Sequence, residues 1–73
     1  MLNETEKNAM RADIASVCEA IIRDGGDPIK QLSGYILSED TIYIPAETRS
    51  VIRKYDRDDL LDVLISDYIK HTK

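Results

Sequence analysis

Cysteine and histidine, the residues that most often form a nucleophile and its base, occur once each in this sequence, as Cys18 and His71. A cysteine nucleophile needs an adjacent base, and a zinc site needs about four ligands. Most of the chain separates the two residues, and no glycine-rich cofactor loop accompanies them. The sequence therefore predicts no catalytic residue, no cofactor and no metal site, and indicates a protein that is not an enzyme.

Aspartates form a second cluster of potential ligands between residues 56 and 62, namely Asp56, Asp58, Asp59 and Asp62. A calcium loop of the EF-hand type needs alternating ligands, a central glycine and a glutamate at about its twelfth position. The cluster has none of these features. The interpretation that we favour is a helix cap at residue 56, followed by a solvated first turn.

A basic patch precedes these aspartates and consists of Arg49, Arg53, Lys54 and Arg57. If this stretch is helical, residues 49, 53 and 57 share one face, and the patch is a candidate surface for binding a partner. An acidic protein, a phosphorylated segment and nucleic acid are the possible partners. The interpretation that we favour is a solvated face that pairs with the aspartates. A net charge of −4 and a pI of about 4.8 argue against nucleic acid.

The 73 residues fit one domain, residues 1–73, whose core is small for its surface. One cysteine excludes an internal disulfide, and the chain has neither Phe nor Trp. Association with a second copy is the remaining way to bury more surface, so we expect a homodimer. The sequence shows no long apolar run and no signal peptide, so we expect a cytoplasmic protein without membrane insertion.

The hydrophobic pattern predicts a first helix that begins near Glu4. Residues 1–7, which precede or open this helix, are expected to form a short frayed tail. Asn3 and Glu6 have the spacing of a capping box. Gly25-Gly26 should end this helix. Its apolar face recurs with the helical period and consists of Met10, Ile14, Val17, Cys18, Ile21 and Ile22.

A second helix should begin after Asp27, with Pro28 at its first position, and end near Leu37 or Ser38. Its predicted buried face is Ile29, Leu32 and Ile36. Gly34 within it indicates the close approach of another backbone, with a loop as the alternative.

Residues 41–44 have strand propensity. This segment either packs as an extended piece of chain or pairs with the same segment of a second chain. Pro45 should open a third helix that contains Val51, Ile52 and Tyr55, and Asp56 should cap a fourth. The apolar face of the fourth helix is Leu60, Leu61, Leu64, Ile65, Tyr68 and Ile69. The sequence therefore predicts a mostly α fold, a small bundle of about four helices with one short extended segment near residues 41–44, as a homodimer.

Three blocks of this sequence resemble the IreB family of small cytoplasmic regulatory phosphoproteins of low-GC Gram-positive bacteria. Residues 27–38, Asp-Pro-Ile-Lys-Gln-Leu-Ser-Gly-Tyr-Ile-Leu-Ser, resemble the family's Asn-Pro-Ile-Asn-Gln-Ile-Val-Gly-Tyr-Val-Leu-Ser. Residues 43–45 match its Tyr-Ile-Pro. Residues 52–61, Ile-Arg-Lys-Tyr-Asp-Arg-Asp-Asp-Leu-Leu, resemble its Ile-Arg-Lys-x-Glu-Arg-Asp-Glu-Ile-Ile.

The resemblance implies a helical homodimer that is a substrate of a transmembrane Ser/Thr kinase and a negative regulator of cephalosporin resistance. The family's phosphorylated threonines lie in a flexible arm before the first helix, and that arm is shorter here. Thr5 is its single threonine and the phosphorylation candidate. Because Thr5 stands closer to the helix than the family's sites, an ordinary residue of the first helical turn is the favoured alternative.

The stretch from Gly34 to Pro45 is expected to lie in or beside the dimer interface. The candidate interface residues are Gly34, Tyr35, Ile42, Tyr43 and Ile44. Three functions therefore compete: a kinase-dependent regulator in cell-envelope stress, an adaptor dimer that binds a protein partner without being phosphorylated, and a small nucleic-acid-binding module. The resemblance favours the first.

Overall fold

The structure, a computed structural model, describes residues 2–72 and is built from helices. In chain order these are α1 (Glu4–Arg23), α2 (Pro28–Ser38), the short 3-10 helices η1 (Thr41–Tyr43) and η2 (Ala46–Thr48), α3 (Arg49–Ile52) and α4 (Arg57–His71). No strand occurs between residues 2 and 72. The prediction of a mostly α fold with about four helices is confirmed.

A capping box fixes the start of α1, as the sequence predicts. The backbone N–H of Glu6 donates to the Asn3 side chain at 2.8 Å, and the backbone N–H of Asn3 donates to the Glu6 carboxylate at 3.0 Å. This reciprocal cap satisfies N–H groups that a helix start leaves free. Residues 4–7 are therefore helical, and the prediction of a frayed tail is wrong for them. Met1 lies outside the described residues.

The connection between α1 and α2 also follows the sequence. Gly25 takes a φ of +83°, which glycine adopts without strain. The N–H of Gly26 then bonds to the carbonyl of Ile21 at 2.8 Å and closes the end of α1. Asp27 caps α2 by accepting from the N–H of Ile29 at 3.0 Å, and Pro28 occupies the first position of that helix. Both predicted boundaries are confirmed.

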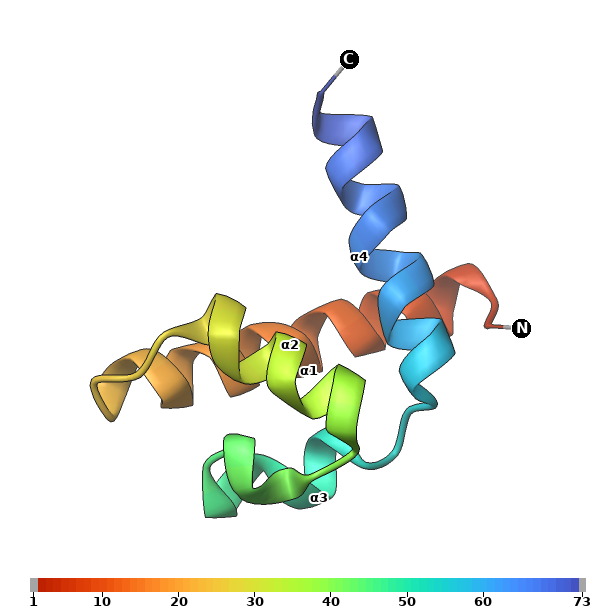
Figure 1. Ribbon diagram of the computed structural model, residues 1–73. Coiled ribbons are helices and arrows are strands. Elements are labelled where there is room, and N and C mark those ends of the chain that lie inside the picture. Colours follow the sequence, from red (N-terminus) through yellow and green to blue (C-terminus); the bar gives the residue numbers. More distant parts are fainter. Residues whose placement is uncertain (1, 73) are drawn as a thin grey trace.

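Helix α1 is the centre of the core. It contacts α2, α3, α4 and η2, and Met10, Val17 and Ile21 are completely buried on it. The predicted apolar face is confirmed at these positions and at Ile14, whereas Ile22 is 61% exposed. Figure 1 shows α2 and α3 gathered on α1, with the C-terminal half of α4 extending away from them.

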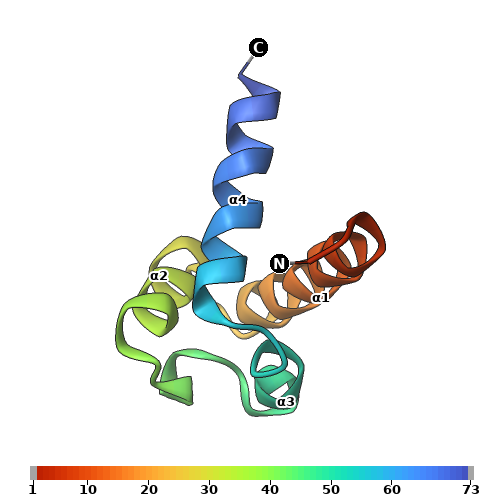
Figure 2. The same ribbon diagram turned by 90° about the vertical axis from the view of Figure 1, so that its right-hand side faces the viewer.

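The predicted buried faces of α2 and α4 are partly wrong. Leu32 and Ile36 of α2 and Leu64 of α4 are half-buried against the core, but other predicted positions are exposed. Tyr35 is the buried residue of α2, whereas Ile29 is 78% exposed. On α4, Leu60 and Val63 are buried, and the later residues are not. The cause is visible in Figure 2, where α4 stands nearly alone beyond its first turns and has no neighbour to cover its second half. None of the helices in the described part of the chain is long and apolar enough to cross a membrane.

Residues 41–43 form a 3-10 turn, so the prediction of an extended segment is wrong there. The side chain of Asp40 accepts from the N–H of Ile42 at 3.0 Å and starts the turn. Such local bonds by aspartate compete with strand formation. Ile44 alone has the expected extended backbone, and its side chain is 1% exposed within the core. Local capping therefore overrides the β propensity of this segment.

Donors from two other helices hold this turn in place. Gln31 of α2 donates to the carbonyl of Tyr43 at 2.9 Å. The Nε of Arg49 donates to the carbonyls of Thr41 and Ile44 at 2.9 and 3.0 Å. Buried or half-buried carbonyls need such partners, so these side chains fix the turn against the rest of the chain.

One predicted helix start, that at Pro45, is shifted by one position, and the start of α4 is as predicted. Pro45 precedes η2 as its N-cap instead of being its first residue. Asp56 is the N-cap of α4, as predicted, although its side chain makes no capping hydrogen bond. The third helix is accordingly a short 3-10 turn followed by one α-helical turn.

Gly34 lies inside α2, and its neighbour is an aromatic ring of the same chain. A Cβ atom at this position would lie 2.8 Å from two ring carbons of Tyr43, far inside normal contact. The predicted close approach at Gly34 is therefore present, but it involves the Tyr43 side chain and not a second backbone. The missing Cβ lets η1 lie against α2.

We expect Gly34→Ala to destabilise the protein, although alanine exceeds glycine in helix propensity by about 1 kcal/mol. The added methyl group would displace the Tyr43 ring. In a Tyr43→Ala background the ring is absent, so the same change should stabilise by up to about 1 kcal/mol. Chemical denaturation of the four proteins measures both effects. Equal stabilisation in the two backgrounds would show that the ring does not constrain residue 34.

Candidate functional site

A polar hollow of about 360 Å³ lies where the end of α2 meets the turn between α3 and α4. Tyr35, Glu39 and Thr41 line one side of it. The other side is formed by the segment between α3 and α4, which includes Arg53, and by Arg57, the first residue of α4. Two of the predicted partner-binding residues therefore come together here, and we call this space the polar hollow.

Arg57 closes the C-terminal end of α2. Its Nη1 donates to the carbonyl of Ile36 at 2.7 Å, and its Nη2 lies 3.3 Å from the carboxylate of Glu39. Glu39 is the C-cap of α2 and has a φ of +62°, a left-handed conformation that costs a non-glycine residue about 1–2 kcal/mol. Arg57 thus satisfies an end carbonyl of the helix and pairs with the strained cap residue.

The four predicted partner-binding residues do not form one helical face. Helix α3 ends at Ile52, so Arg49 and Arg53 lie on different elements from Arg57. Arg49 is bound to the carbonyls of η1, and Lys54 lies 3.1 Å from the Asp13 carboxylate. Within residues 2–72, Arg53 is the member that makes no ion pair or side-chain hydrogen bond. The prediction of a shared helical face is wrong because a turn interrupts the helix.

Tyr55 and Lys54 attach the same turn to α1 through Asp13. The Tyr55 hydroxyl donates to the Asp13 carboxylate, and the Lys54 ammonium approaches the same oxygen. The hydrogen bond from Tyr55 is the main cause that lowers the pKa of Asp13, and Lys54 adds to it. The same hydrogen bond raises the pKa of Tyr55 to about 12. This contact joins residues that are 42 positions apart.

A second ion pair joins α1 to the projecting half of α4. The guanidinium of Arg11 donates to both carboxylate oxygens of Asp67, at 2.9 and 3.0 Å. Bidentate pairs of this kind fix orientation as well as distance. The bond raises the pKa of Arg11 and lowers that of Asp67. It is the attachment of α4 to α1 beyond the buried core.

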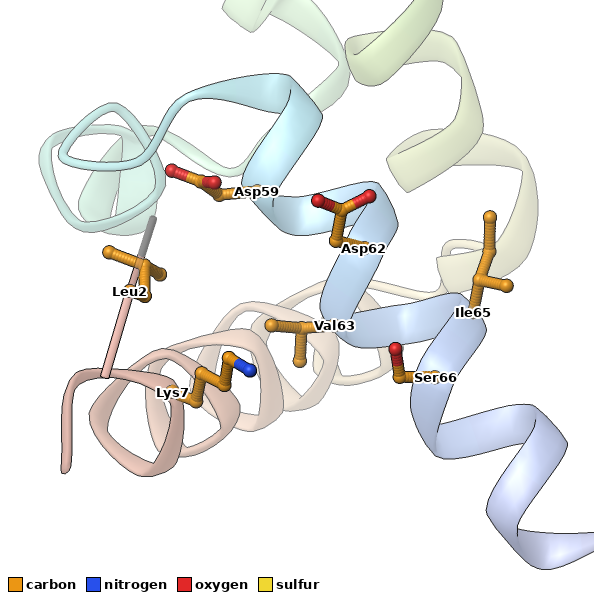
Figure 3. A pocket seen from close by; sticks show the side chains of 7 residues that line it. All are labelled: Leu2, Lys7, Asp59, Asp62, Val63, Ile65 and Ser66. Carbon is orange, nitrogen blue, oxygen red and sulfur yellow. The ribbon is translucent and has the colours of Figure 1, made fainter. Parts of the chain in front are cut away.

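A further hollow of about 270 Å³ lies between the N-terminal end of α1 and α4. Figure 3 shows Lys7 reaching from α1 toward this space, with Asp59 and Asp62 on the α4 side. These two members of the predicted aspartate cluster line the hollow together with Lys7, whose ammonium pairs with Glu4 at 3.8 Å. No group of three or more His, Cys, Asp or Glu residues that could hold a metal ion occurs in the described part of the chain.

Cys18 borders an apolar hollow of about 310 Å³ between α2 and α4, lined on its other sides by Leu32, Leu61 and Leu64 among others. We call this space the apolar hollow. Burial raises the pKa of the Cys18 thiol, and a raised pKa lowers the fraction of reactive thiolate. His71 is exposed in the last turn of α4, on a different element. Among residues 2–72, no basic or acidic side chain lines the apolar hollow beside Cys18.

Thr5 is exposed in the first turn of α1, two residues after the capping residue. Its neighbours in that turn, Glu4 and Glu6, are acidic. The phosphorylation candidate is therefore part of a capped helix and not of a free arm.

The predicted dimer-interface residues separate into two groups. Tyr35 and Ile44 are 5% and 1% exposed and belong to the core of their own chain, and Gly34 is covered by the ring of Tyr43. Ile42 and Tyr43 are 72% and 40% exposed. Only the last two present side-chain surface to a second copy, because η1 folds back and seals the others.

Sequence reasoning did not connect Tyr35 with Arg53, or Asp13 with Tyr55. Each pair joins residues that lie far apart along the chain, and neither has a local spacing that would indicate contact. Glu39 stands at the end of α2, where glycine is common. The lack of glycine there was the one available signal of an unusual turn after α2.

The sequence matches one described protein family, IreB regulatory phosphoprotein, over residues 1–70. The match includes every helix except the last residue of α4. It therefore covers the polar hollow, Thr5 and the apolar hollow together.

The Asp13–Tyr55 bond should make stability depend on pH at both ends of the scale. Because the pKa of Tyr55 is raised, its hydrogen bond contributes stability below pH 10.0. This contribution is lost as the pH rises toward about 12. Because the pKa of Asp13 is lowered, its carboxylate contributes stability above pH 3.8. This contribution is lost as the pH falls further. Replacing Tyr55 by Phe should cost about 1 kcal/mol at neutral pH, and this difference should shrink at both extremes. Urea unfolding of both proteins at each pH measures it, and a pH-independent difference would contradict the bond.

Proposed function

The chain belongs to the family of IreB regulatory phosphoproteins, and we propose that it is a non-enzymatic regulator controlled by a Ser/Thr kinase. The observation that carries this function is the family match, which extends over nearly the whole chain, residues 1–70 of 73. We propose that it acts in the cytoplasm as a homodimer. Its pathway is the response to cell-envelope stress, including intrinsic cephalosporin resistance.

Thr5 is the residue that we propose as the phosphate acceptor. Its side chain is exposed, and a phosphoryl group in the first turn of a helix is favoured by the helix dipole. Glu4 and Glu6 oppose that charge from either side. The capping box of Asn3 and Glu6 also holds the turn in helical form, so transfer to Thr5 requires local opening of this turn.

The adaptor function has one specific observation in its favour. Because Thr5 lies within a capped turn, the protein has no free threonine arm among residues 2–7 of the kind that the resemblance implies. An adaptor would bind its partner in the unphosphorylated state, and Arg53 is the exposed predicted contact that makes no ion pair within residues 2–72. Phosphate mapping separates the two functions.

The homodimer is supported by apolar surface that one copy leaves uncovered. Ile29 on α2 and Leu61, Ile65, Tyr68 and Ile69 on α4 are between 40% and 78% exposed. The apolar hollow lies between these two helices. An isolated helical segment is marginally stable in water, so the projecting half of α4 gains from a neighbour. We propose that a second copy covers the apolar hollow and α4 in an isologous contact.

Incubation with the catalytic domain of such a kinase, followed by mass spectrometry, should place phosphate on Thr5 and not on a Thr5→Ala variant. Asn3→Ala removes the capping box, which is worth about 1 kcal/mol. It should therefore raise the initial rate of phosphorylation about fivefold by populating the open turn. Thr72→Ala, an exposed threonine in the last turn, is the matched control and should have no effect. Absence of transfer to any residue would leave the adaptor function instead.

Light scattering at micromolar concentration should give the mass of a dimer. Ile65→Asp, on the projecting half of α4, should give a monomer because it places a charge within the proposed contact. Ile42→Asp tests the other candidate surface, the exposed part of η1, and should leave the dimer intact. Dissociation by Ile42→Asp alone would move the interface to residues 34–45, and a monomeric parent protein would exclude both surfaces.

A further inference from the structure

The polar hollow is bordered by a tyrosine hydroxyl that no residue between 2 and 72 uses. Tyr35 is 5% exposed, and its hydroxyl has no hydrogen-bond partner within residues 2–72. In that part of the chain, no side-chain nitrogen or oxygen is both fully buried and without a hydrogen-bond partner. The small exposed part of Tyr35 therefore includes the hydroxyl, and Tyr35 borders the polar hollow. A tyrosine this deeply buried usually bonds to a partner.

Further donors surround this hydroxyl. Arg53 lines the polar hollow and makes no ion pair of its own within the described residues. Arg57 lines it too, and its bonds to Ile36 and Glu39 use only its two Nη atoms. The Thr41 hydroxyl makes no hydrogen bond to the described residues, although the Thr41 carbonyl does. The free donors thus come from α2, η1, the turn after α3 and the first residue of α4.

We propose that the polar hollow binds a phosphorylated threonine or serine side chain. A phosphoryl group carries about −1.5 to −2 charges and three acceptor oxygens, which suits two guanidinium groups with hydroxyls beside them. The volume of about 360 Å³ is in the range of small-ligand sites, roughly 300–1,000 Å³. This goes beyond the proposed function, in which Thr5 accepts a phosphoryl group, because here the chain recognises one.

Two carboxylates also line the polar hollow, and they act differently. Glu39 already pairs with Arg57 at 3.3 Å, so its charge is largely compensated. Asp56 makes no capping hydrogen bond to α4 and opposes a bound anion. Asp56 should therefore weaken phosphoryl binding. Removing its charge should strengthen binding, whereas removing an arginine should weaken it.

Titration with phosphothreonine, followed by NMR shifts of the backbone amides, tests the site without a kinase. Phosphothreonine should shift the amides of residues 35–41 and 53–57, whereas threonine should not. Arg53→Gln should weaken binding at least about tenfold, and Asp56→Asn should tighten it about threefold. Arg23→Gln removes the same charge outside the polar hollow and is the matched control.

Tyr35→Phe gives the sharpest readout. The lost hydroxyl has no partner in the protein, so the melting temperature should stay the same while phosphothreonine binding weakens about tenfold. Equal binding by the parent, Tyr35→Phe and Arg53→Gln proteins would overturn the site. A failed titration would leave phosphorylation of Thr5 untouched, since no kinase takes part in it.

A peptide of residues 2–9 phosphorylated at Thr5 identifies the source of the ligand. If it binds more tightly than phosphothreonine itself, the first turn of a second copy is the source. If it binds equally, the site reads the phosphoryl group of another protein. If the peptide does not bind while phosphothreonine does, a second copy is excluded as the source. Loss of both would overturn the phosphoryl site itself.

Discussion

The arrangement of this small protein depends on satisfying the backbone carbonyls of the turn at residues 41–44. Ile44 is nearly completely buried, so this irregular piece of chain must enter the core with its polar groups paired. Gln31 and Arg49 supply the donors. The Thr41 carbonyl also accepts from the N–H of Ile44 at 3.0 Å, so the loss of these donors would affect the carbonyls of Tyr43 and Ile44 most. The turn also covers Gly34 with the ring of Tyr43 and packs against α2.

This constraint explains why a run of basic residues is not a simple binding surface. Arg49 holds η1, Arg57 closes α2, and Lys54 pairs with Asp13. Their charges serve contacts between helices, in a chain too small to rely on apolar burial alone. Arg53 differs because its side chain is exposed and unpaired within the described residues. The residues that form the polar hollow are therefore largely those that hold the fold, which couples any ligand there to the packing of α2.

The two ends of the molecule differ in how completely they are packed. Around the middle of α1 the core is closed, and Met10, Val17 and Ile21 have no exposed surface. Beyond Val63, α4 keeps its contact with α1 through the Arg11–Asp67 pair while its apolar residues remain uncovered. A second copy on this side would complete the core. A phosphoryl group on Thr5 would act at the opposite terminus of the chain, in the first turn of α1.

Much of the local structure was predictable because its causes are local. The Asn3–Glu6 capping box, the glycines after α1 and the Asp27-Pro28 start of α2 each act within a few residues, and the structure confirms them. The periodicity of α1 likewise identified most of its buried face. The amino-acid types alone also determined that no disulfide can form within the chain.

The tertiary structure decided which apolar residues are buried and what the charged residues do. Periodicity places Ile29 and Ile65 on apolar faces, but burial depends on a neighbouring element, and these faces have none within one copy. The β propensity of residues 41–44 lost to the Asp40 cap and to donors from α2 and α3. Likewise, Tyr35 and Arg53 line the same hollow only because the tertiary fold brings α2 beside the turn after α3. Contacts of this kind depend on the whole packing arrangement, and no local spacing in the sequence encodes them.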